Sequence, residues 1–150
     1  MIEGVKIKKL RVIPDQRGRL MEIFRCDDEA FEEFGQVYMT TAYPGVIKGW
    51  HYHKLQDDNF TCIQGQALFA LYDPRENSPT RGELNDFIVS LQDPLLIHIP
   101  KGVYHGFKNI GSTEAVVINT VTKPYSHNNP DEYRLDAFDK AIGYKWDRRE

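Results

Sequence analysis

The chain is 150 residues long and carries a formal net charge of −3, with 41% hydrophobic and 27% charged residues. This length is typical of one domain, so we expect a single domain over residues 1–150. The lack of a basic surplus argues against nucleic-acid binding and a basic membrane patch, and every apolar run is too short to span a bilayer.

Taken in chain order, the sequence has the pattern of many short strands. Runs rich in β-branched and aromatic residues recur between Gly, Pro, Asn and Asp, which is typical of a β-sandwich or β-barrel. The expected strands are Val5–Ile13, Leu20–Phe24, Gln36–Tyr43, Val46–His53, Asn59–Ile63, Ala67–Tyr72, Asp86–Ser90, Leu95–Ile99, His105–Asn109 and Ala115–Val121.

Two short helical segments are expected among these strands. Asp28–Phe34 has acidic residues at its start, where the helix dipole favours them, and Gly35 follows its end. Asp136–Lys140 is expected to form a helical turn. The predicted class is therefore all-β with minor helices.

The N-terminus and the cysteines indicate the compartment. Charges occur within the first ten residues without an apolar stretch, so we expect no secretory signal. Cys26 and Cys62 belong to no CxxC pair, which favours two reduced thiols in a cytoplasmic protein.

Two stretches contain the residues that could act in catalysis or bind a metal. GVIKGWHYHKLQDDNFTCIQG contains His51, His53 and Asp58, and PKGVYHGFKN contains His105. Side chains two apart on a strand face the same side, so His51 and His53 are expected to point together. Asp58 would return on the next strand and His105 would arrive from a later one. We therefore predict that the four side chains gather around one cavity.

Both stretches match the two cupin motifs, with Asp58 where that superfamily usually has glutamate. The whole chain resembles, in a shortened form, the dTDP-4-dehydrorhamnose 3,5-epimerase family. The matching segments are Asp15–Phe24, the region of Gln36, Val46–His53, Asp73–Gly82, Ile99–Phe107, Thr122–Tyr133 and Leu135–Trp146. The resemblance implies a cupin-type jelly-roll barrel and a homodimer. It also implies a nucleotide-linked 4-keto-6-deoxyhexose as substrate, no metal or organic cofactor, and a place in deoxysugar and polysaccharide biosynthesis.

The resemblance also implies roles for individual residues. His51 takes the position of the histidine base that removes the proton next to the C4 ketone, and Asp139 that of its aspartate partner. The remaining positions, which the resemblance assigns to substrate binding, are Arg17, Glu22, Gln36, Lys48, His53, His105, Asn119 and Tyr125. Lys48 replaces an arginine, which changes a forked donor to a point charge.

Three positions depart from the family pattern. Asp58 stands where the family has an active-site lysine, His53 where it has a glutamine, and Asn119 where it has the tyrosine proposed as the acid. Without that tyrosine, water, Tyr38 or Tyr125 would have to supply the proton on the far face. The predicted reaction is therefore epimerisation at C3, at C5 or at both, with inversion of a single centre favoured.

The same substitutions support a second hypothesis. His51, His53, Asp58 and His105 form a set that suits a divalent transition metal, which predicts a metal-dependent isomerase or dioxygenase. A non-catalytic sugar-binding cupin is the third alternative.

Overall fold

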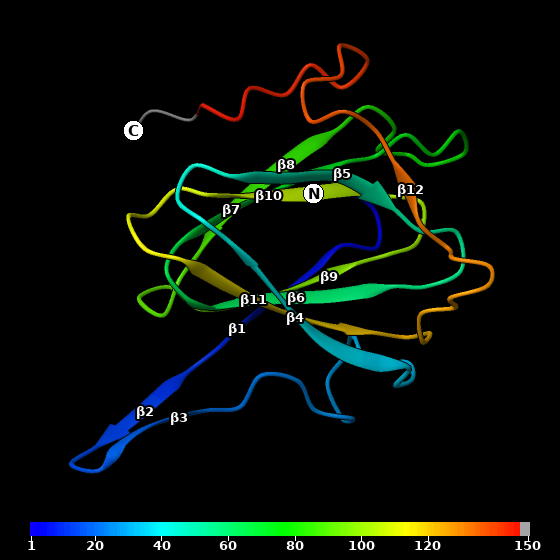
Figure 1. Cartoon of the computed structure of the whole chain (residues 1–150). Coiled ribbons are helices and arrows are strands. Elements are labelled where there is room, and N and C mark those ends of the chain that lie inside the picture. The colour runs from blue at the N-terminus through cyan, green and yellow to red at the C-terminus, as the bar shows by residue number, and fades with distance from the viewer. Residues whose placement is uncertain (148–150) are drawn as a thin grey trace.

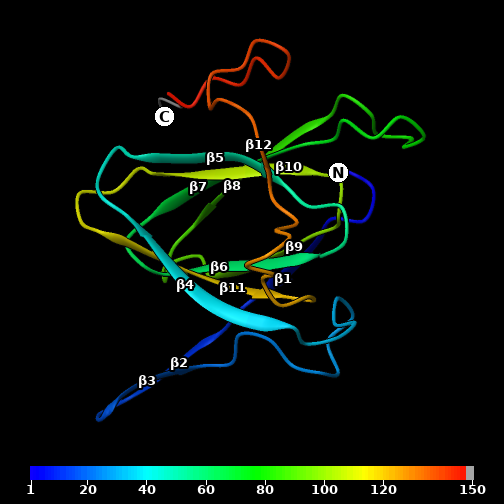
Figure 2. The same ribbon diagram turned by 45° about the vertical axis from the view of Figure 1, so that its right-hand side comes forward.

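Two five-stranded antiparallel sheets face each other, and a two-stranded hairpin projects from them (Figures 1 and 2). The computed structural model describes residues 1–147. The strands are β1 (Lys6–Lys9), β2 (Val12–Asp15), β3 (Gly18–Met21), β4 (Gln36–Ala42), β5 (Ile47–Tyr52), β6 (Asp58–Gln64), β7 (Ala67–Tyr72), β8 (Leu84–Val89), β9 (Leu95–Ile99), β10 (Tyr104–Asn109), β11 (Ala115–Val121) and β12 (Tyr133–Arg134). The first sheet has the order β1-β9-β6-β11-β4 and the second the order β12-β5-β10-β7-β8. This confirms the predicted all-β jelly-roll fold.

The inner faces of the two sheets meet in an apolar core, because alternate residues of a strand point to the same side. In β11, Ala115, Val117, Asn119 and Val121 are buried, and the residues between them are half-buried. Strands β7 and β9 each lie between two neighbours and are buried along nearly their whole length. The core therefore occupies the space between the sheets, where burial of apolar surface stabilises the fold.

A second apolar cluster covers the other face of the sheet that contains β5. Trp50 precedes His51 on β5, so its side chain points to the opposite face of the strand from that of His51. Its ring centroid lies 5.0 Å from that of Trp146, and both indole N–H groups donate to the carbonyl of Ala137. The C-terminal segment thus passes over β5, as Figure 1 shows, and holds that strand from outside.

Strands β5 and β10 approach each other closely because glycines face each other across them. A Cβ atom on Gly106 would lie 2.7 Å from the Cα of Gly49 and 2.8 Å from the carbonyl oxygen of Lys48, so no larger residue fits without a backbone shift. In this register His105 stands opposite His51. The glycine pair therefore helps to bring two of the predicted site residues together.

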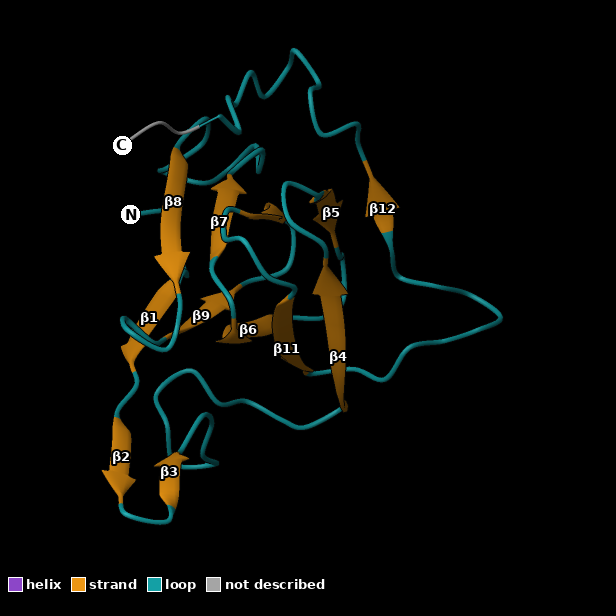
Figure 3. Cartoon of the chain, turned by 60° about the vertical axis from the view of Figure 1, so that its left-hand side comes forward, coloured by secondary structure: helices purple, strands orange, loops and turns teal. Residues whose placement is uncertain are grey.

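The helices expected at Asp28–Phe34 and Asp136–Lys140 do not form, and residues 1–147 contain no helix (Figure 3). Seven residues are fewer than the roughly 12–15 that an isolated helix needs in water. The carboxylate of Asp28 is instead bound by the ammonium of Lys8 at 2.6 Å and the backbone N–H of Arg25 at 2.8 Å. No described helix is thus long and apolar enough to cross a membrane.

The N-terminal residues form two short strands and not the single strand expected from the sequence. The run expected as one strand over Val5–Ile13 is divided into β1 and β2, and β2 pairs with β3 in a hairpin outside the two main sheets. Ile13 and Leu20 on this hairpin are 49% and 60% exposed. The hairpin thus presents apolar side chains to solvent.

Candidate active site

A cavity of about 1020 Å³ opens between the two sheets, at the upper end of the usual size for a small-molecule site. Both sheets and the segment before β12 contribute to its wall. The polar side chains in this wall that could bind substrate or transfer a proton are Gln36, Tyr38, Thr40, Lys48, His51, His53, His105, Tyr125, Glu132 and Arg134. Of the predicted cluster, His51, His53 and His105 line the cavity, and Asp58 lies directly behind two of them.

His51 has the properties of a proton acceptor. Its Nδ1 is buried without a hydrogen bond and lies 3.8 Å from Oε1 of Glu132, which is beyond hydrogen-bonding distance. The His51 side chain lines the cavity. Burial, and after it the charges of His105 and Arg134, together lower the pKa of His51 to about 4. The imidazole is therefore neutral near pH 7, as a general base must be.

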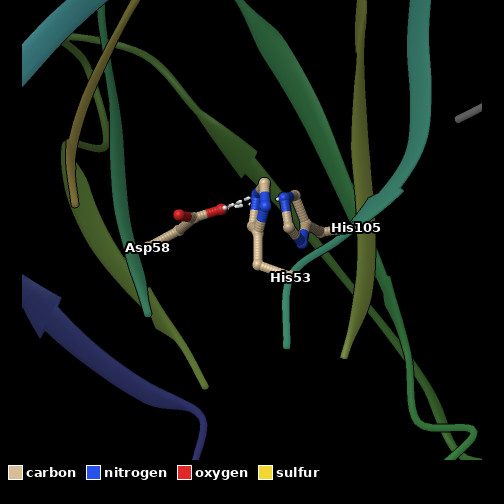
Figure 4. A group of neighbouring side chains, drawn as sticks. All are labelled: His53, Asp58 and His105. Atoms are coloured by element: carbon tan, nitrogen blue, oxygen red, sulfur yellow. Dashed lines mark ion pairs between the residues drawn. The ribbon is translucent and has the colours of Figure 1, made fainter. Parts of the chain in front are cut away.

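His53, Asp58 and His105 converge on one point, as Figure 4 shows. Oδ2 of Asp58 lies 3.2 Å from Nε2 of His53 and 2.9 Å from Nε2 of His105. Asp58 is only 1% exposed, and its other oxygen, Oδ1, accepts a hydrogen bond of 2.8 Å from the amide of Gln56. His51 stands apart, with its ring centroid 6.4 Å from that of His105. The structure thus brings three of the four alternative metal ligands together.

The charges in this cluster are interdependent. Burial by itself raises the pKa of Asp58, but the two imidazoles outweigh that effect and hold it below its usual range. Burial lowers the pKa of His53, but Asp58 outweighs it and raises that pKa to about 8. An anionic carboxylate beside at least one cationic imidazole is therefore the state expected near pH 7 without a bound ion.

Tyr38 and Asn119 form a cross-strand pair between β4 and β11. Nδ2 of Asn119 donates to the phenol oxygen of Tyr38 at 2.8 Å, and Oδ1 of Asn119 accepts from the backbone N–H of Asn59 at 2.9 Å. The second contact fixes the orientation of the amide. Burial and the negative charge of Asp58 raise the pKa of Tyr38 to about 12, so the phenol stays protonated near pH 7.

Three other predicted binding residues lie in the cavity wall. Lys48 donates through Nζ to the hydroxyl of Thr40 at 2.9 Å, which fixes its ammonium between the two sheets. Oε1 of Gln36 accepts from the backbone N–H of Tyr125 at 2.7 Å and so holds the loop that carries this tyrosine. Their roles in substrate binding remain predictions.

Four predicted site residues lie elsewhere. Asp139 accepts a hydrogen bond from the backbone N–H of Ala141, and Glu132 rather than Asp139 is the carboxylate near His51. Arg17 and Glu22 lie on or next to the projecting hairpin, where they pair with Asp15 and Arg25. Asn119 is fully buried behind Tyr38 and does not line the cavity. Within this chain, therefore, none of the four reaches the cavity.

Glu132 and Arg134 line the cavity but are not among the residues predicted from the sequence. They flank Tyr133 around the two-residue strand β12, which places Arg134 opposite His51. Oε1 of Glu132 accepts a hydrogen bond of 2.7 Å from Arg134. A strand this short leaves no periodic pattern, so the resemblance over Thr122–Tyr133 was the one available signal.

Comparisons with known proteins agree with this geometry. The model of the dTDP-4-dehydrorhamnose 3,5-epimerase family matches residues 1–150. The spore coat polysaccharide biosynthesis protein SpsL of Bacillus subtilis is 43% identical over 146 residues, which cover 97% of each chain. A dTDP sugar isomerase structure from Desulfovibrio desulfuricans is 30% identical, with a TM-score of 0.92 over 99% of this chain and 94% of that one. A Legionella pneumophila dTDP-6-deoxy-D-glucose-3,5-epimerase structure with dTDP-4-keto-L-rhamnose is 26% identical, with a TM-score of 0.86 over 99% and 81%.

Proposed function

Because the chain belongs to the dTDP-4-dehydrorhamnose 3,5-epimerase family, we propose that it epimerises a dTDP-linked 4-keto-6-deoxyhexose next to the ketone. The observation that carries this proposal is a neutral histidine, His51, in a large cavity of a chain that matches the family over its whole length. The names of the similar proteins support a dTDP-sugar substrate and a role in polysaccharide biosynthesis.

In the proposed reaction, Nε2 of His51 takes the proton from the carbon beside the ketone. The bonding pair of that C–H bond moves to the ketone and leaves an enolate oxygen that needs a positive or hydrogen-bonding partner. Lys48, fixed by Thr40, is a charged donor in the same cavity. Glu132 stabilises the imidazolium, since its carboxylate lies 3.8 Å from Nδ1.

We propose Tyr38 as the donor that returns a proton to the opposite face of the carbon. His51 and Tyr38 come from different sheets and both line the cavity, which suits removal and return on opposite sides. The phenol oxygen of Tyr38 accepts its hydrogen bond from Asn119, so its own proton is free for the substrate. After each turnover the phenolate regains a proton from solvent and His51 releases one.

Proton NMR of dTDP-4-keto-6-deoxyglucose with the protein in D2O tests both roles. The wild type is expected to replace a C3 or C5 proton with deuterium and to form the epimer. His51→Asn should abolish exchange, whereas Tyr38→Phe should keep exchange but form little epimer. Tyr43→Phe, at an exposed tyrosine outside the cavity, is the matched control. Deuterium exchange that persists in His51→Asn would show that His51 is not the base. Full epimerisation by Tyr38→Phe would show that Tyr38 is not the proton donor.

These proton transfers use protein side chains alone, so the proposed reaction requires no metal or organic cofactor. A metal-dependent isomerase or dioxygenase is less well supported, because the family match and the similar proteins point to epimerisation. A non-catalytic sugar-binding role is less well supported for the same reason. In the NMR assay, turnover by chelator-treated protein would support the metal-free reaction, and turnover restored only by an added divalent metal would support the metal-dependent alternative. Substrate binding without turnover in either state would support the sugar-binding role.

We also propose that the protein is a homodimer in the cytoplasm. A two-stranded hairpin is marginally stable alone, and Leu20 on β3 is 60% exposed. Strand β4 is an edge of its sheet, and its Met39 is 62% exposed. A partner's hairpin against this region would cover both surfaces and carry Arg17 and Glu22 toward the partner's cavity. Leu20→Asp is expected to give a monomer in light scattering, and an unchanged mass would contradict the proposal.

A further inference from the structure

We propose that His53, Asp58 and His105 form a binding site for one divalent transition-metal ion in the wall of the cavity. This inference goes beyond the proposed epimerisation and does not depend on it. Three observations carry it: the protonation pattern of the two imidazoles, the unsatisfied oxygen of Asp58, and the convergence of the three donor atoms, which all lie within 4.8 Å of one another.

The hydrogen bonds of the two histidines determine which ring nitrogen carries the proton. Nδ1 of His53 lies 2.6 Å from the carbonyl oxygen of Asp131, and Nδ1 of His105 lies 3.1 Å from that of Val103. A carbonyl oxygen only accepts, so each Nδ1 must be the donor. In its neutral form each ring then directs the lone pair of Nε2 toward Asp58. Metal-binding histidines are commonly oriented by this same contact on the other nitrogen.

The carboxylate of Asp58 is unsatisfied where these nitrogens meet. Its Oδ2 is buried and accepts no well-formed hydrogen bond, although both Nε2 atoms lie within 3.2 Å of it. Two lone pairs and an anionic oxygen at this separation repel one another unless protons or a cation lie between them.

The donor set and its dimensions suit a first-row ion. Two donor atoms that are each about 2.1 Å from one ion lie roughly 3.0 Å apart at octahedral angles and roughly 3.4 Å apart at tetrahedral angles. Oδ2 of Asp58 lies 2.9 Å and 3.2 Å from the two Nε2 atoms, close to the octahedral value. Two imidazoles and one carboxylate bind Zn²⁺, Fe²⁺, Mn²⁺ and Co²⁺ and leave further coordination positions open. His53 and His105 line the cavity, so those positions would be accessible to water or to an oxygen of a bound sugar.

The experiment titrates chelator-treated protein with Co²⁺, followed by visible absorption, and with Zn²⁺, followed by calorimetry. The wild type is expected to bind one equivalent. Asp58→Asn and His53→Gln should weaken binding by about 100-fold, because each removes one of three ligands. His127→Gln, in the loop that follows Tyr125, is the matched control and should bind as the wild type does. Absence of stoichiometric binding by the wild type, or equal binding by Asp58→Asn, would overturn the proposal.

A measurement on the wild type covers the case in which a variant does not fold. Nitrogen-15 NMR of the histidine rings is expected to show Zn²⁺ shifting Nε2 of His53 and His105 while both Nδ1 atoms keep their protons. Nε2 protons that persist at saturating Zn²⁺ would show that protons, not a metal, occupy the cluster. Deuterium exchange by metal-free protein then separates the two proposals. Deuterium exchange by a protein that binds no metal would refute the metal site and leave the epimerase proposal standing. Metal binding by a protein that shows no deuterium exchange, with or without the metal, would refute the epimerase proposal and leave the metal site standing.

Discussion

The carboxylate of Asp73 is expected to be one of the most sensitive single groups for the stability of this fold. It follows β7 and is completely buried, and both of its oxygens are used. Oδ1 accepts from the backbone and Nε of Arg75 at 3.0 Å and 2.8 Å. Oδ2 accepts from Nη2 of Arg75 at 3.0 Å and from the hydroxyls of Ser78 and Thr80 at 2.6 Å and 2.7 Å. The loop between β7 and β8 is thus organised around one negative charge.

We expect Asp73→Asn to lower the free energy of unfolding by about 3–5 kcal/mol near neutral pH, the cost typical of breaking a buried ion pair. The amide keeps one acceptor oxygen, but the charge that the guanidinium and both hydroxyls contact is lost. Urea unfolding of wild type and variant measures the difference. Asp27→Asn is the matched control, since Asp27 makes a similar ion pair with Arg25 but is 64% exposed. An Asp73 variant that loses no more stability than this control would refute the reasoning.

The pH dependence gives a second test of Asp73. Burial raises the pKa of Asp73, but Arg75, Ser78 and Thr80 outweigh burial and hold that pKa below its ordinary value of 3.8. A carboxyl whose pKa is depressed by folding adds stability that is present above its unfolded pKa and is lost as the pH falls. The difference between wild type and Asp73→Asn should therefore be constant around neutrality and shrink below about pH 4. A difference that grew on acidification would have the wrong sign.

Three further predictions concern the strands that carry the site. Gly106→Ala should lower the free energy of unfolding in urea by about 1–3 kcal/mol, because the new Cβ would lie 2.7 Å from the Cα of Gly49. A variant as stable as the wild type would show that β5 and β10 can accommodate a methyl group between them. Trp146→Ala should lower the free energy of unfolding by about 3–5 kcal/mol and reduce turnover, because Trp146 packs on Trp50 beside His51. A loss of stability with full turnover would show that this apolar cluster does not position His51. Glu132→Gln should lower kcat by about tenfold at an unchanged melting temperature, and unaltered kcat would exclude support of His51 by Glu132.

Much of the fold could be predicted from local patterns. Turn residues separate short apolar runs, and β7, β9 and β11 have the bounds expected from them. The incorrect secondary-structure predictions lie where tertiary contacts determine the conformation of the chain. Residues 28–34 look helical because of their composition, but Lys8 and the backbone of Arg25 hold the carboxylate of Asp28 in a turn.

The candidate site was predictable to the extent that it depends on strand periodicity. The spacing of His51 and His53 places both in one cavity wall, and the second motif adds His105. The partners of these residues depend on chain packing that no short-range pattern encodes. Glu132 approaches His51 because β12 adds to the edge of β5, and Asp139 is directed into its own loop.

The contact between Tyr38 and Asn119 has a consequence for how relatives of this chain should be compared. In an antiparallel sheet, directly opposed residues on adjacent strands point to the same face, and here the two are 81 residues apart in the chain. A functional group lost at one alignment position can therefore be supplied by its cross-strand neighbour. In other members of the family that lack a tyrosine at the position of Asn119, the residue matching Tyr38 should be inspected before the chain is classified as inactive. Substitution within such a pair can keep a phenol in the cavity while the tyrosine changes its position in the sequence.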